Sequence, residues 1–175
     1  MSHLGAKVYR LTDAIGAPLA LVIRSLGDEE AHQRELELVE LLASWVRTSI
    51  SAQRFHDVHE TMRFAMWTTI RHPDRSVVLA EERLQPVGIV IGELKRVQRE
   101  RHGFVDWIVV NPDRRREGIG SVLIVGFARA IGVDRLEGSV DLGDPVASSF
   151  WERQGWTRVK PPPRRLMMGG PVSRR

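Results

Sequence analysis

Apolar positions change their period about halfway along the chain. Up to about residue 72 they recur every three or four positions, which is typical of helices with one buried face. Residues 8–11, which come first, alternate apolar and polar side chains and predict a short strand. The helical period then predicts three helices, over residues 13–26, 28–48 and 53–71.

Local signals place the ends of these helices. Gly27 interrupts the first helix, and Asp28 is the expected N-cap of the second, because a carboxylate accepts hydrogen bonds from first-turn amides. Residues 72–74 contain a proline and end the third helix. The helical region 28–71 therefore ends before a segment whose apolar pattern is no longer helical.

From residue 76 onward, short apolar runs bounded by turn residues predict strands. Residues 76–80 and 86–94 are the arms of a predicted hairpin, and a charged loop is expected over residues 95–102. The other expected elements are strand 104–110, helix 118–131, strand 136–142, helix 146–154, and strands 156–159 and 165–168. This mixed order predicts an α/β or α+β fold, with one domain around a single sheet over residues 1–168 and a loose tail over 169–175.

Composition excludes several classes of protein. The chain has no cysteine, which rules out disulfides, thiolate zinc sites and an acyl intermediate carried on cysteine. No run approaches the roughly 18 apolar residues that cross a membrane, and residues 1–5 lack the pattern of a signal peptide. We therefore expect a cytoplasmic protein with no membrane partner.

The charge is modest, and almost all of its positive side is arginine. The formal net charge is +4, a weak indication of nucleic-acid binding, so we expect no nucleic-acid partner. The arginine bias reports either the base composition of the genome or a ligand that carries phosphate. His56 and His59 have a spacing that can hold a metal ion, but no other ligand cluster accompanies them, and we expect no metal site.

The segment that carries chemistry follows the strand 104–110. A turn over residues 111–113 leads into a loop, punctuated by Gly118 and Gly120, that opens a helix. Such a loop leaves backbone N–H groups unpaired at the positive end of a helix dipole, where they suit a pyrophosphate. A third glycine at position 123 would make a dinucleotide loop, but Leu123 stands there. A Walker loop would need a lysine after Gly120, and Ser121 follows instead.

Residues 115–120, Arg-Arg-Glu-Gly-Ile-Gly, match the pattern [Q/R]-x-x-G-x-[G/A], and residues 144–156 match a second pattern, N-x-x-A-x-x-F-[Y]-x-x-x-G-[F], with departures. With both motifs in register, residues 76–168 resemble the GNAT superfamily of acyl-CoA-dependent N-acyltransferases. The resemblance implies a mixed, mostly antiparallel central sheet with a splayed strand pair, flanked by helices. It also implies acetyl-CoA as the co-substrate.

The resemblance assigns roles to particular residues. The backbone amides of residues 116–121 would hold the pyrophosphate, and the strand before the loop would hydrogen-bond the pantetheine arm as an added strand. The cofactor-binding residues implied are Ile108, Val109, Val110, Arg115, Arg116, Glu117, Gly118, Ile119, Gly120 and Ser121, with Asp144 and Trp151 from the second motif.

Asp106 is the candidate general base, because family members often carry a glutamate on this strand and an amine must be neutral to attack. Strand alternation predicts Asp106, Ile108 and Val110 on one face. The other interpretation is an ion pair between Asp106 and a nearby arginine.

Two positions of the second motif depart from the family pattern. Trp151 stands where the family usually has a tyrosine that acts as the general acid. Because an indole cannot protonate a thiolate, water or another group must do so. Asp144 stands where asparagine is common. It either contacts the cofactor or caps the helix that begins near Val146.

These observations predict an N-acetyltransferase in which a primary amine, on a small molecule or a protein, attacks acetyl-CoA directly in a ternary complex. Two alternatives stay open: an acceptor amine on a protein or an aminoacyl-tRNA, and a non-catalytic acyl-CoA-binding regulatory module. The helical region 28–71 either covers the acceptor site or forms the face of a homodimer.

Overall fold

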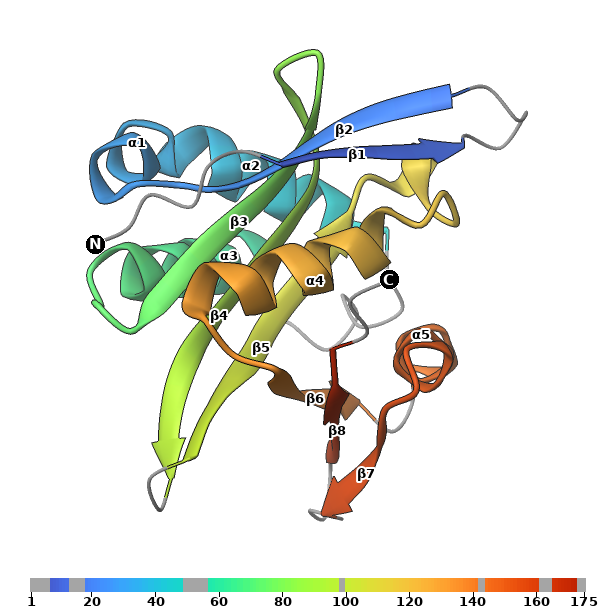
Figure 1. Cartoon of the computed structure of the whole chain (residues 1–175). Coiled ribbons are helices and arrows are strands. Elements are labelled where there is room, and N and C mark those ends of the chain that lie inside the picture. The colour runs from blue at the N-terminus through green and yellow to red at the C-terminus, as the bar shows by residue number, and fades with distance from the viewer. Residues whose placement is uncertain are drawn as a thin grey trace.

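The structure is a computed structural model of the chain, and it describes residues 7–12, 18–48, 57–97, 100–141, 144–160 and 165–172. These residues form one eight-stranded sheet with the strand order β1-β2-β3-β4-β5-β6-β8-β7. Every neighbouring pair is antiparallel except β5 and β6, which are parallel (Figure 1). The strands are β1 (Lys7–Thr12), β2 (Pro18–Ser25), β3 (Arg75–Glu82), β4 (Gln85–Val97), β5 (Glu100–Val110), β6 (Arg135–Asp141), β7 (Thr157–Lys160) and β8 (Arg165–Pro171).

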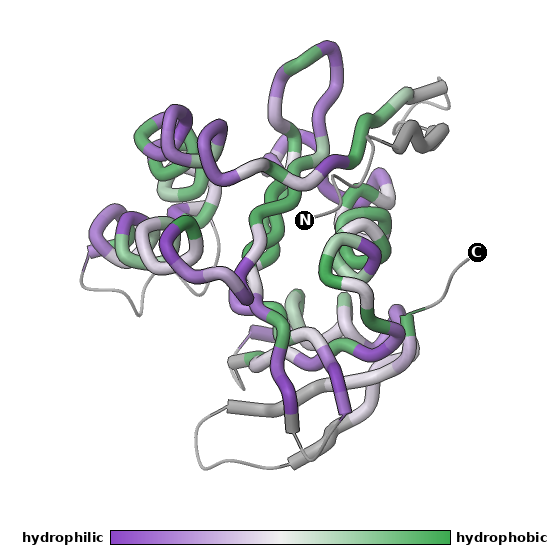
Figure 2. Tube along the Cα trace, turned by 60° about the vertical axis from the view of Figure 1, so that its left-hand side comes forward, coloured by the Kyte–Doolittle hydropathy of each residue, from purple (hydrophilic) through white to green (hydrophobic). Residues whose placement is uncertain are grey.

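Helices cover both faces of this sheet (Figure 2). One face carries α1 (Asp28–Gln33), α2 (Glu35–Arg47) and α3 (Val58–Ile70), and the other carries α4 (Ile119–Ile131). A short 3-10 helix, η2 (Pro112–Arg114), precedes α4, and α5 (Pro145–Arg153) packs against β6. This arrangement confirms the predicted mixed, mostly antiparallel sheet flanked by helices. None of the helices in these described segments combines the length and the apolar character that a membrane crossing needs.

The core consists of two hydrophobic clusters, one on each face of the sheet. Between the sheet and α4, the side chains of Ile119, Leu123 and Phe127 are fully buried, at the four-residue spacing of one helix face. Gly88 on β4 allows close packing there, because a Cβ at this position would lie 2.8 Å from Leu123 Cδ1. Helix α4 is therefore held tightly on β4, and this packing fixes where the loop before α4 lies.

The helix predicted over residues 13–26 is wrong, because residues 18–25 form strand β2 between β1 and β3. Leu21 and Ile23 are buried, whereas Val22 and Arg24 between them are only partly buried, which is the alternation of a strand. The same apolar residues also satisfied a helical spacing, and pairing with two neighbouring strands decided between the two. Residues 13–17 lie outside the described residues.

The charged loop predicted over residues 95–102 is also wrong. Strand β4 continues to Val97 and β5 begins at Glu100, with Lys95 opposite His102 and Arg96 opposite Arg101. Charged side chains hid a strand hairpin whose backbone pairing continues past the apolar core. At the other end of the chain, residues 169–171 belong to β8 and pair with β6, so they are not part of the expected loose tail, and residues 173–175 lie outside the described residues.

Two helix ends also differ from the prediction. Gly27, not Asp28, is the N-cap of α1, and Asp28 is its first residue. Helix α3 begins at Val58, because Asp57 caps it by accepting a hydrogen bond from the Glu60 amide at 3.1 Å. Residues 53–56 of the predicted third helix lie outside the described residues.

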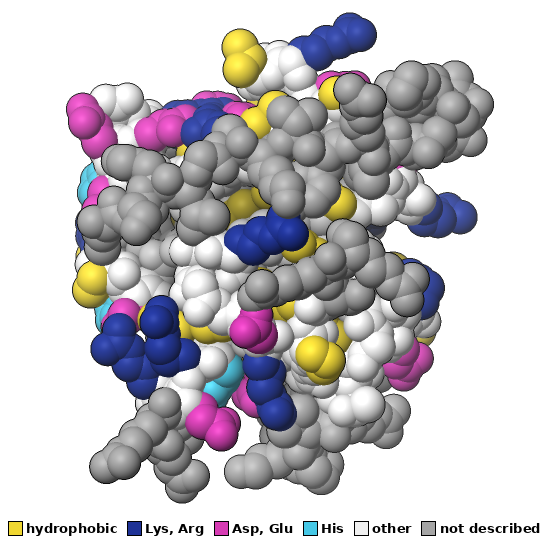
Figure 3. Space-filling model, in the orientation of Figure 1, with side chains coloured by type: hydrophobic (Ala, Val, Ile, Leu, Met, Phe, Trp, Pro, Cys, Tyr) yellow, Lys and Arg dark blue, Asp and Glu magenta, His cyan; other side chains and the backbone are white. Residues whose placement is uncertain are grey.

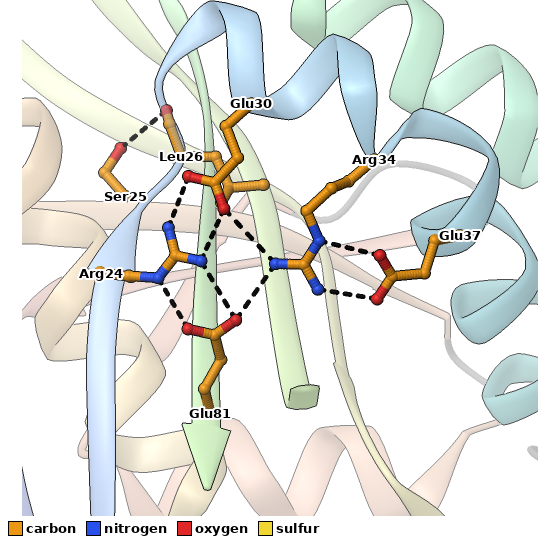
Figure 4. A network of polar contacts seen from close by, with 7 residues as sticks. All are labelled: Arg24, Ser25, Leu26, Glu30, Arg34, Glu37 and Glu81. Carbon is orange, nitrogen blue, oxygen red and sulfur yellow. Dashed lines mark hydrogen bonds and ion pairs between the residues drawn. The ribbon is translucent and has the colours of Figure 1, made fainter. Parts of the chain in front are cut away.

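A network of ion pairs joins α1 and α2 to the sheet, and nothing in the sequence predicted it (Figure 4). Glu81 on β3 has a side chain that is only 4% exposed. It accepts hydrogen bonds from Arg24 Nε at 2.7 Å and from Arg34 Nη1 at 3.1 Å. Arg24 also binds Glu30 and Arg34 binds Glu37, each through two bonds of 2.7 or 2.8 Å. The α1–α2 junction is thereby fixed over the C-terminal half of β3.

Candidate functional site

Strands β5 and β6 begin as a parallel pair and then diverge. Residues 103–105 of β5 pair with residues 136–138 of β6. Beyond them, residues 106–110 and 139–141 continue without pairing to each other (Figure 1). This divergence is the splayed strand pair that the family resemblance implied.

The backbone of β5 presents hydrogen-bonding groups to this divergence. The amide of Asn111 donates to the carbonyl oxygen of Val87 at 3.0 Å, so these two residues are a hydrogen-bonded pair of the β4–β5 ladder. In an antiparallel ladder, alternate residues of a strand direct their N–H and C=O groups to opposite sides. Val109, two residues before Asn111, is therefore bonded to β4, whereas the N–H and C=O groups of Ile108 and Val110 point toward β6. Ile108 and Val110 are therefore the residues of this strand whose backbone suits an added strand.

The loop before α4 has an unusual backbone. Arg116 and Gly118 both have positive φ angles, 69° and 80°, and Gly118 is the N-cap of α4. For a residue such as Arg116 this conformation costs on the order of 1–3 kcal/mol, which is typical of functional loops. Within the described part of the chain, the amides of residues 116–120 have no hydrogen-bond acceptor. These five N–H groups lie in and immediately before the first turn of α4.

The run of free amides is one residue shorter than predicted. Ser121 N–H donates to the Gly118 carbonyl at 3.0 Å, and Val122 N–H donates to the same oxygen at 3.2 Å. Ser121 is also held through its side chain, which accepts a hydrogen bond from Gln154 Nε2 at 3.0 Å. Residues 116–120, and not 116–121, therefore present the donors.

Two arginines of this loop are bound to other parts of the protein. Arg114 bonds to Glu82 at 2.6 Å and to Glu117 at 2.9 Å, and these contacts raise its pKa further above the usual value. Arg115 Nη2 donates to the carbonyl oxygen of Trp45 at the end of α2, at 3.2 Å. The side chain of Arg116 is exposed. The side chains of Arg114 and Arg115 are thus both engaged in contacts within the protein.

The second motif mainly supports the first. Asp144 Oδ1 accepts a hydrogen bond from the Ala147 amide at 2.9 Å and caps α5, which was one of its two predicted roles. Phe150 packs over Gly120, where a Cβ would lie 2.9 Å from the ring. The sequence indicated a glycine for close approach of a ligand at position 120, but it did not show that the phenylalanine of the second motif also requires it.

Trp151 is part of the core. The residue is 4% exposed, and its ring stacks on that of Trp156 with centroids 4.2 Å apart. A Cβ at Gly138 would lie 3.8 Å from the Trp151 ring, and Gly138 pairs with Val105 at the last position before β5 and β6 diverge. Trp151 therefore packs at the closed end of the divergence.

Asp106 occupies a β-bulge. On β4, Ile91 and Gly92 are consecutive, but their partners on β5 are Trp107 and Val105, so Asp106 is the extra residue. Its carboxylate contacts Arg75 of β3, at the beginning of the strand whose Val77 and Leu79 pack beneath α1–α3. The prediction that Asp106 shares a face with Ile108 and Val110 is therefore wrong: those two pack on the α4 side, and the bulge reverses the alternation.

The surroundings of Asp106 make it a stronger base than an ordinary carboxylate. Burial raises its pKa above the usual value, the charge of Arg75 opposes this rise, Glu93 adds to it, and Lys95 lowers it. Arg75 Nη1 donates to Asp106 Oδ2 at 3.0 Å, so the predicted alternative, an ion pair with an arginine, is also present. The side chain of Asp106 remains 22% exposed, which leaves it accessible to a ligand.

The structure describes only one residue of the histidine pair considered as a metal site. His56 lies outside the described residues, and His59 Nε2 lies 2.9 Å from Glu40 Oε1 on α2. Charged side chains of both signs are interspersed on the α4 face of the molecule (Figure 3). Part of the positive charge of the arginines is thus neutralised by ion pairs, such as those of Arg114 with Glu82 and Glu117.

Comparisons with known proteins agree with this geometry. A family model described as the acetyltransferase (GNAT) family matches residues 37–156. The PaiA N-acetyltransferase of Thermoplasma acidophilum, solved in complex with coenzyme A, is 15% identical with a TM-score of 0.69, over 86% of this chain and 98% of that one. An acetyltransferase of Thermus thermophilus is 22% identical with a TM-score of 0.66, over 87% and 97%. A GNAT-family acetyltransferase of Streptococcus pneumoniae is 20% identical with a TM-score of 0.58, over 87% and 99%. No curated protein sequence matches the chain.

Proposed function

Because the chain belongs to the acetyltransferase (GNAT) family, we propose that it transfers an acetyl group from acetyl-CoA to a primary amine by direct attack in a ternary complex. The observation that carries this proposal is the run of five amides over residues 116–120 without acceptors among the described residues. They lie at the N-terminus of a 13-residue helix, where the dipole adds to the attraction for an anion.

The residues present fit coenzyme A. The amides of residues 116–120 would hold its pyrophosphate. The peptide groups of Ile108 and the N–H group of Val110 would bond its pantetheine arm as an added strand, since the Val110 carbonyl already accepts a hydrogen bond from Arg115 Nε. Arg114 is committed to Glu82 and Glu117, so Arg116 is the better candidate for the 3′-phosphate. A structural neighbour that covers most of this chain was solved with coenzyme A, which supports the same ligand here.

When bound, acetyl-CoA supplies an acyl group activated as a thioester. An N–H group of Ile108 or Val110 is suited to hydrogen-bond the carbonyl oxygen of that group and to stabilise negative charge on it. The chain has no cysteine, so no enzyme thiol can carry the acetyl group, and the amine attacks directly.

Asp106 is the proposed general base. Its raised pKa makes it a better proton acceptor, and Arg75 Nη1 lies 3.0 Å from its Oδ2. It would remove the proton that the amine loses on attack. Trp151 is buried in the core and is no proton donor for the leaving thiolate, so water or another group has to supply that proton.

Calorimetry and a transfer assay test the proposal. The purified chain should bind CoA, and it should release free thiol from acetyl-CoA in the presence of a suitable amine. A useful panel contains phenethylamine, spermidine, lysine and a peptide with a free N-terminus. Absence of CoA binding would contradict the proposal as a whole, because the five amides would then serve some other purpose.

The ion pair of Asp106 with Arg75 favours a second candidate function, that of a non-catalytic acyl-CoA-binding module. In that case Asp106 has a structural role. The chain would then bind CoA with the same loop but transfer nothing to any amine of the panel, and Asp106→Asn would leave CoA binding and every other property of the bound state unchanged.

A further inference from the structure

Asp106 ends a row of four side chains with alternating charge on the α1–α3 side of the sheet. Arg75 Nη1 donates to Asp106 Oδ2 at 3.0 Å, and Arg75 Nη2 lies 3.2 Å from Glu93 Oε2. Lys95 Nζ completes the row at 3.2 Å from Glu93 Oε1. Arg75 and Glu93 stand directly opposite each other in the β3–β4 register, so the sheet itself fixes this arrangement.

We propose that Arg75 is a positioning residue for acetyl transfer: it holds one carboxylate oxygen of Asp106 and leaves the other for a proton of the acceptor amine. The inference rests on the proposed function, in which Asp106 is the base. Its basis is geometric. Arg75 reaches only Oδ2, and Oδ1 has no hydrogen-bond partner among the described residues.

The bulge explains why Asp106 needs such a partner. As the extra residue of β5, it has no directly opposite residue on β4 that would fix its side chain by cross-strand packing. A planar guanidinium with several donors can hold two carboxylates in fixed positions at once, which a lysine cannot do equally well. Arg75 therefore sets the direction of a side chain that the strand pairing leaves unsupported.

Glu93 has the complementary role of sharing the Arg75 charge. Burial raises the pKa of Asp106, Arg75 and Lys95 lower it, and Glu93 raises it. Other polar side chains of these strands have partners of their own: His102 Nε2 lies 3.8 Å from Glu137 Oε2, and Arg96 Nη2 lies 3.9 Å from Asp74 Oδ1. Glu93 thus adds to the rise in the pKa of Asp106 that burial causes, and opposes the effect of Arg75.

Two substitutions should therefore act in opposite directions. Arg75→Gln removes a positive charge, so the pKa of Asp106 rises and the acid limb of the kcat/KM profile moves to higher pH. Glu93→Gln removes a negative charge and leaves the guanidinium to Asp106 alone. The pKa of Asp106 should therefore fall, and the acid limb of the kcat/KM profile should move to lower pH. Lys95→Met is a matched control, because it removes a more distant positive charge and should move both upward by less than Arg75→Gln does.

The measurements are a carbon-13 NMR titration of the Asp106 carboxyl in the free protein, assigned with Asp106→Asn, and the pH profile of transfer to the best amine of the panel. At a pH where Asp106 is ionised, Arg75→Gln should lower kcat on the order of 10²-fold, because a misdirected group loses about this much. The KM for acetyl-CoA should not change. Arg75→Lys should recover part of kcat, which shows whether Arg75→Gln acts through the contact or through the fold.

The outcomes separate this inference from the proposed function. If the wild-type chain transfers acetyl groups but Arg75→Gln and Glu93→Gln shift neither the NMR titration nor the rate profile, the inference alone is overturned. The same holds if the titration shifts as expected and the rate profile does not follow it. If the wild-type chain transfers nothing to any amine, the proposed function fails and the inference fails with it.

Discussion

The guanidinium of Arg115 joins the loop before α4 to the C-terminal end of α2, with its Nη2 3.2 Å from the carbonyl oxygen of Trp45. The same nitrogen lies 3.1 Å from Thr48 Oγ1, and Nε lies 3.3 Å from the Val110 carbonyl. A cation at this end of a helix also interacts favourably with the helix dipole. Arg115 thus connects α2, β5 and the loop, although its side chain does not point to the free amides as a cofactor ligand would.

Arg115→Ala should weaken CoA binding without removing any of the five amides. The loop loses contacts to two carbonyl oxygens, and a net loss of about 1 kcal/mol corresponds to roughly a fivefold higher Kd. Calorimetry with CoA measures the change. Arg115→Lys keeps the charge but not the several donors of the guanidinium, so its Kd should lie between the two. Equal Kd values for all three proteins would show that α2 does not support the loop.

Gly118 is the residue of this loop whose backbone most restricts substitution, because its φ of 80° lies in the left-handed region. Gly118→Ala should cost roughly 1–2 kcal/mol in stability and should raise the Kd for CoA, since alanine disfavours this conformation. Gly118→Asn is the matched variant, because asparagine adopts left-handed φ more readily. Thermal melts and calorimetry check both, and an alanine variant that melts and binds like the asparagine variant would contradict the argument.

The loop was predictable because its signals are local. Two glycines stand between a preceding strand and a following helix, and helix geometry alone leaves the amides of the first turn without acceptors inside the helix. Strand β2 was not predictable in the same way, because Leu19, Val22 and Leu26 satisfy a helical spacing as well. Pairing with β1 and with β3, which begins about 50 residues later in the chain, made residues 18–25 a strand.

The environment of Asp106 was beyond the sequence for a different reason. Alternation predicts the face of a strand residue only while the strand is regular, and a bulge shifts every face on one side of it. The partner Arg75 is 31 residues away, and Gly92, which faces the bulge, carries no local signal of it. The contact of Phe150 with Gly120 is likewise a product of tertiary packing between the two motifs.

Glu81 should be important for stability although it is far from the loop. Glu81→Gln leaves Arg24 and Arg34 without their shared buried partner and should destabilise the fold by about 3 kcal/mol, at the lower end for a broken buried pair because both arginines are partly exposed. Glu37→Gln is the control. Its side chain is 48% exposed, and its loss should cost at most about 1 kcal/mol. Chemical denaturation of both variants measures the difference, and equal free energies of unfolding would contradict the role given to Glu81.

The same network predicts how stability depends on pH. Hydrogen bonds from Arg24 lower the pKa of Glu30, and hydrogen bonds from Arg34 lower the pKa of Glu37. A carboxylate whose pKa is lower in the folded state contributes stability above its unfolded pKa, about 4.3, and loses it as the pH falls through the folded pKa. Melting temperatures should therefore fall below about pH 4.3, and the Glu30→Gln, Glu37→Gln double variant should show a shallower decline. An identical decline would assign the acid sensitivity to other carboxylates.

Asp106→Asn should separate catalysis from stability. Because burial raises the pKa of Asp106, its ionised form is less favourable in the fold than in the unfolded chain, and this unfavourable contribution is present at neutral pH and relieved as the pH falls through the folded pKa. The neutral amide removes that contribution but also loses the charge that faces Arg75, which still has Glu93 3.2 Å away. The two effects oppose each other, so the variant should melt near the wild-type temperature at pH 7.

Transfer to the best amine by the Asp106→Asn variant should nevertheless fall by roughly 10²–10⁴-fold, the usual contribution of a general base, with an unchanged Kd for CoA. Wild-type transfer rates in a folded Asp106→Asn protein would exclude Asp106 as the base and leave its contact with Arg75 a purely structural ion pair.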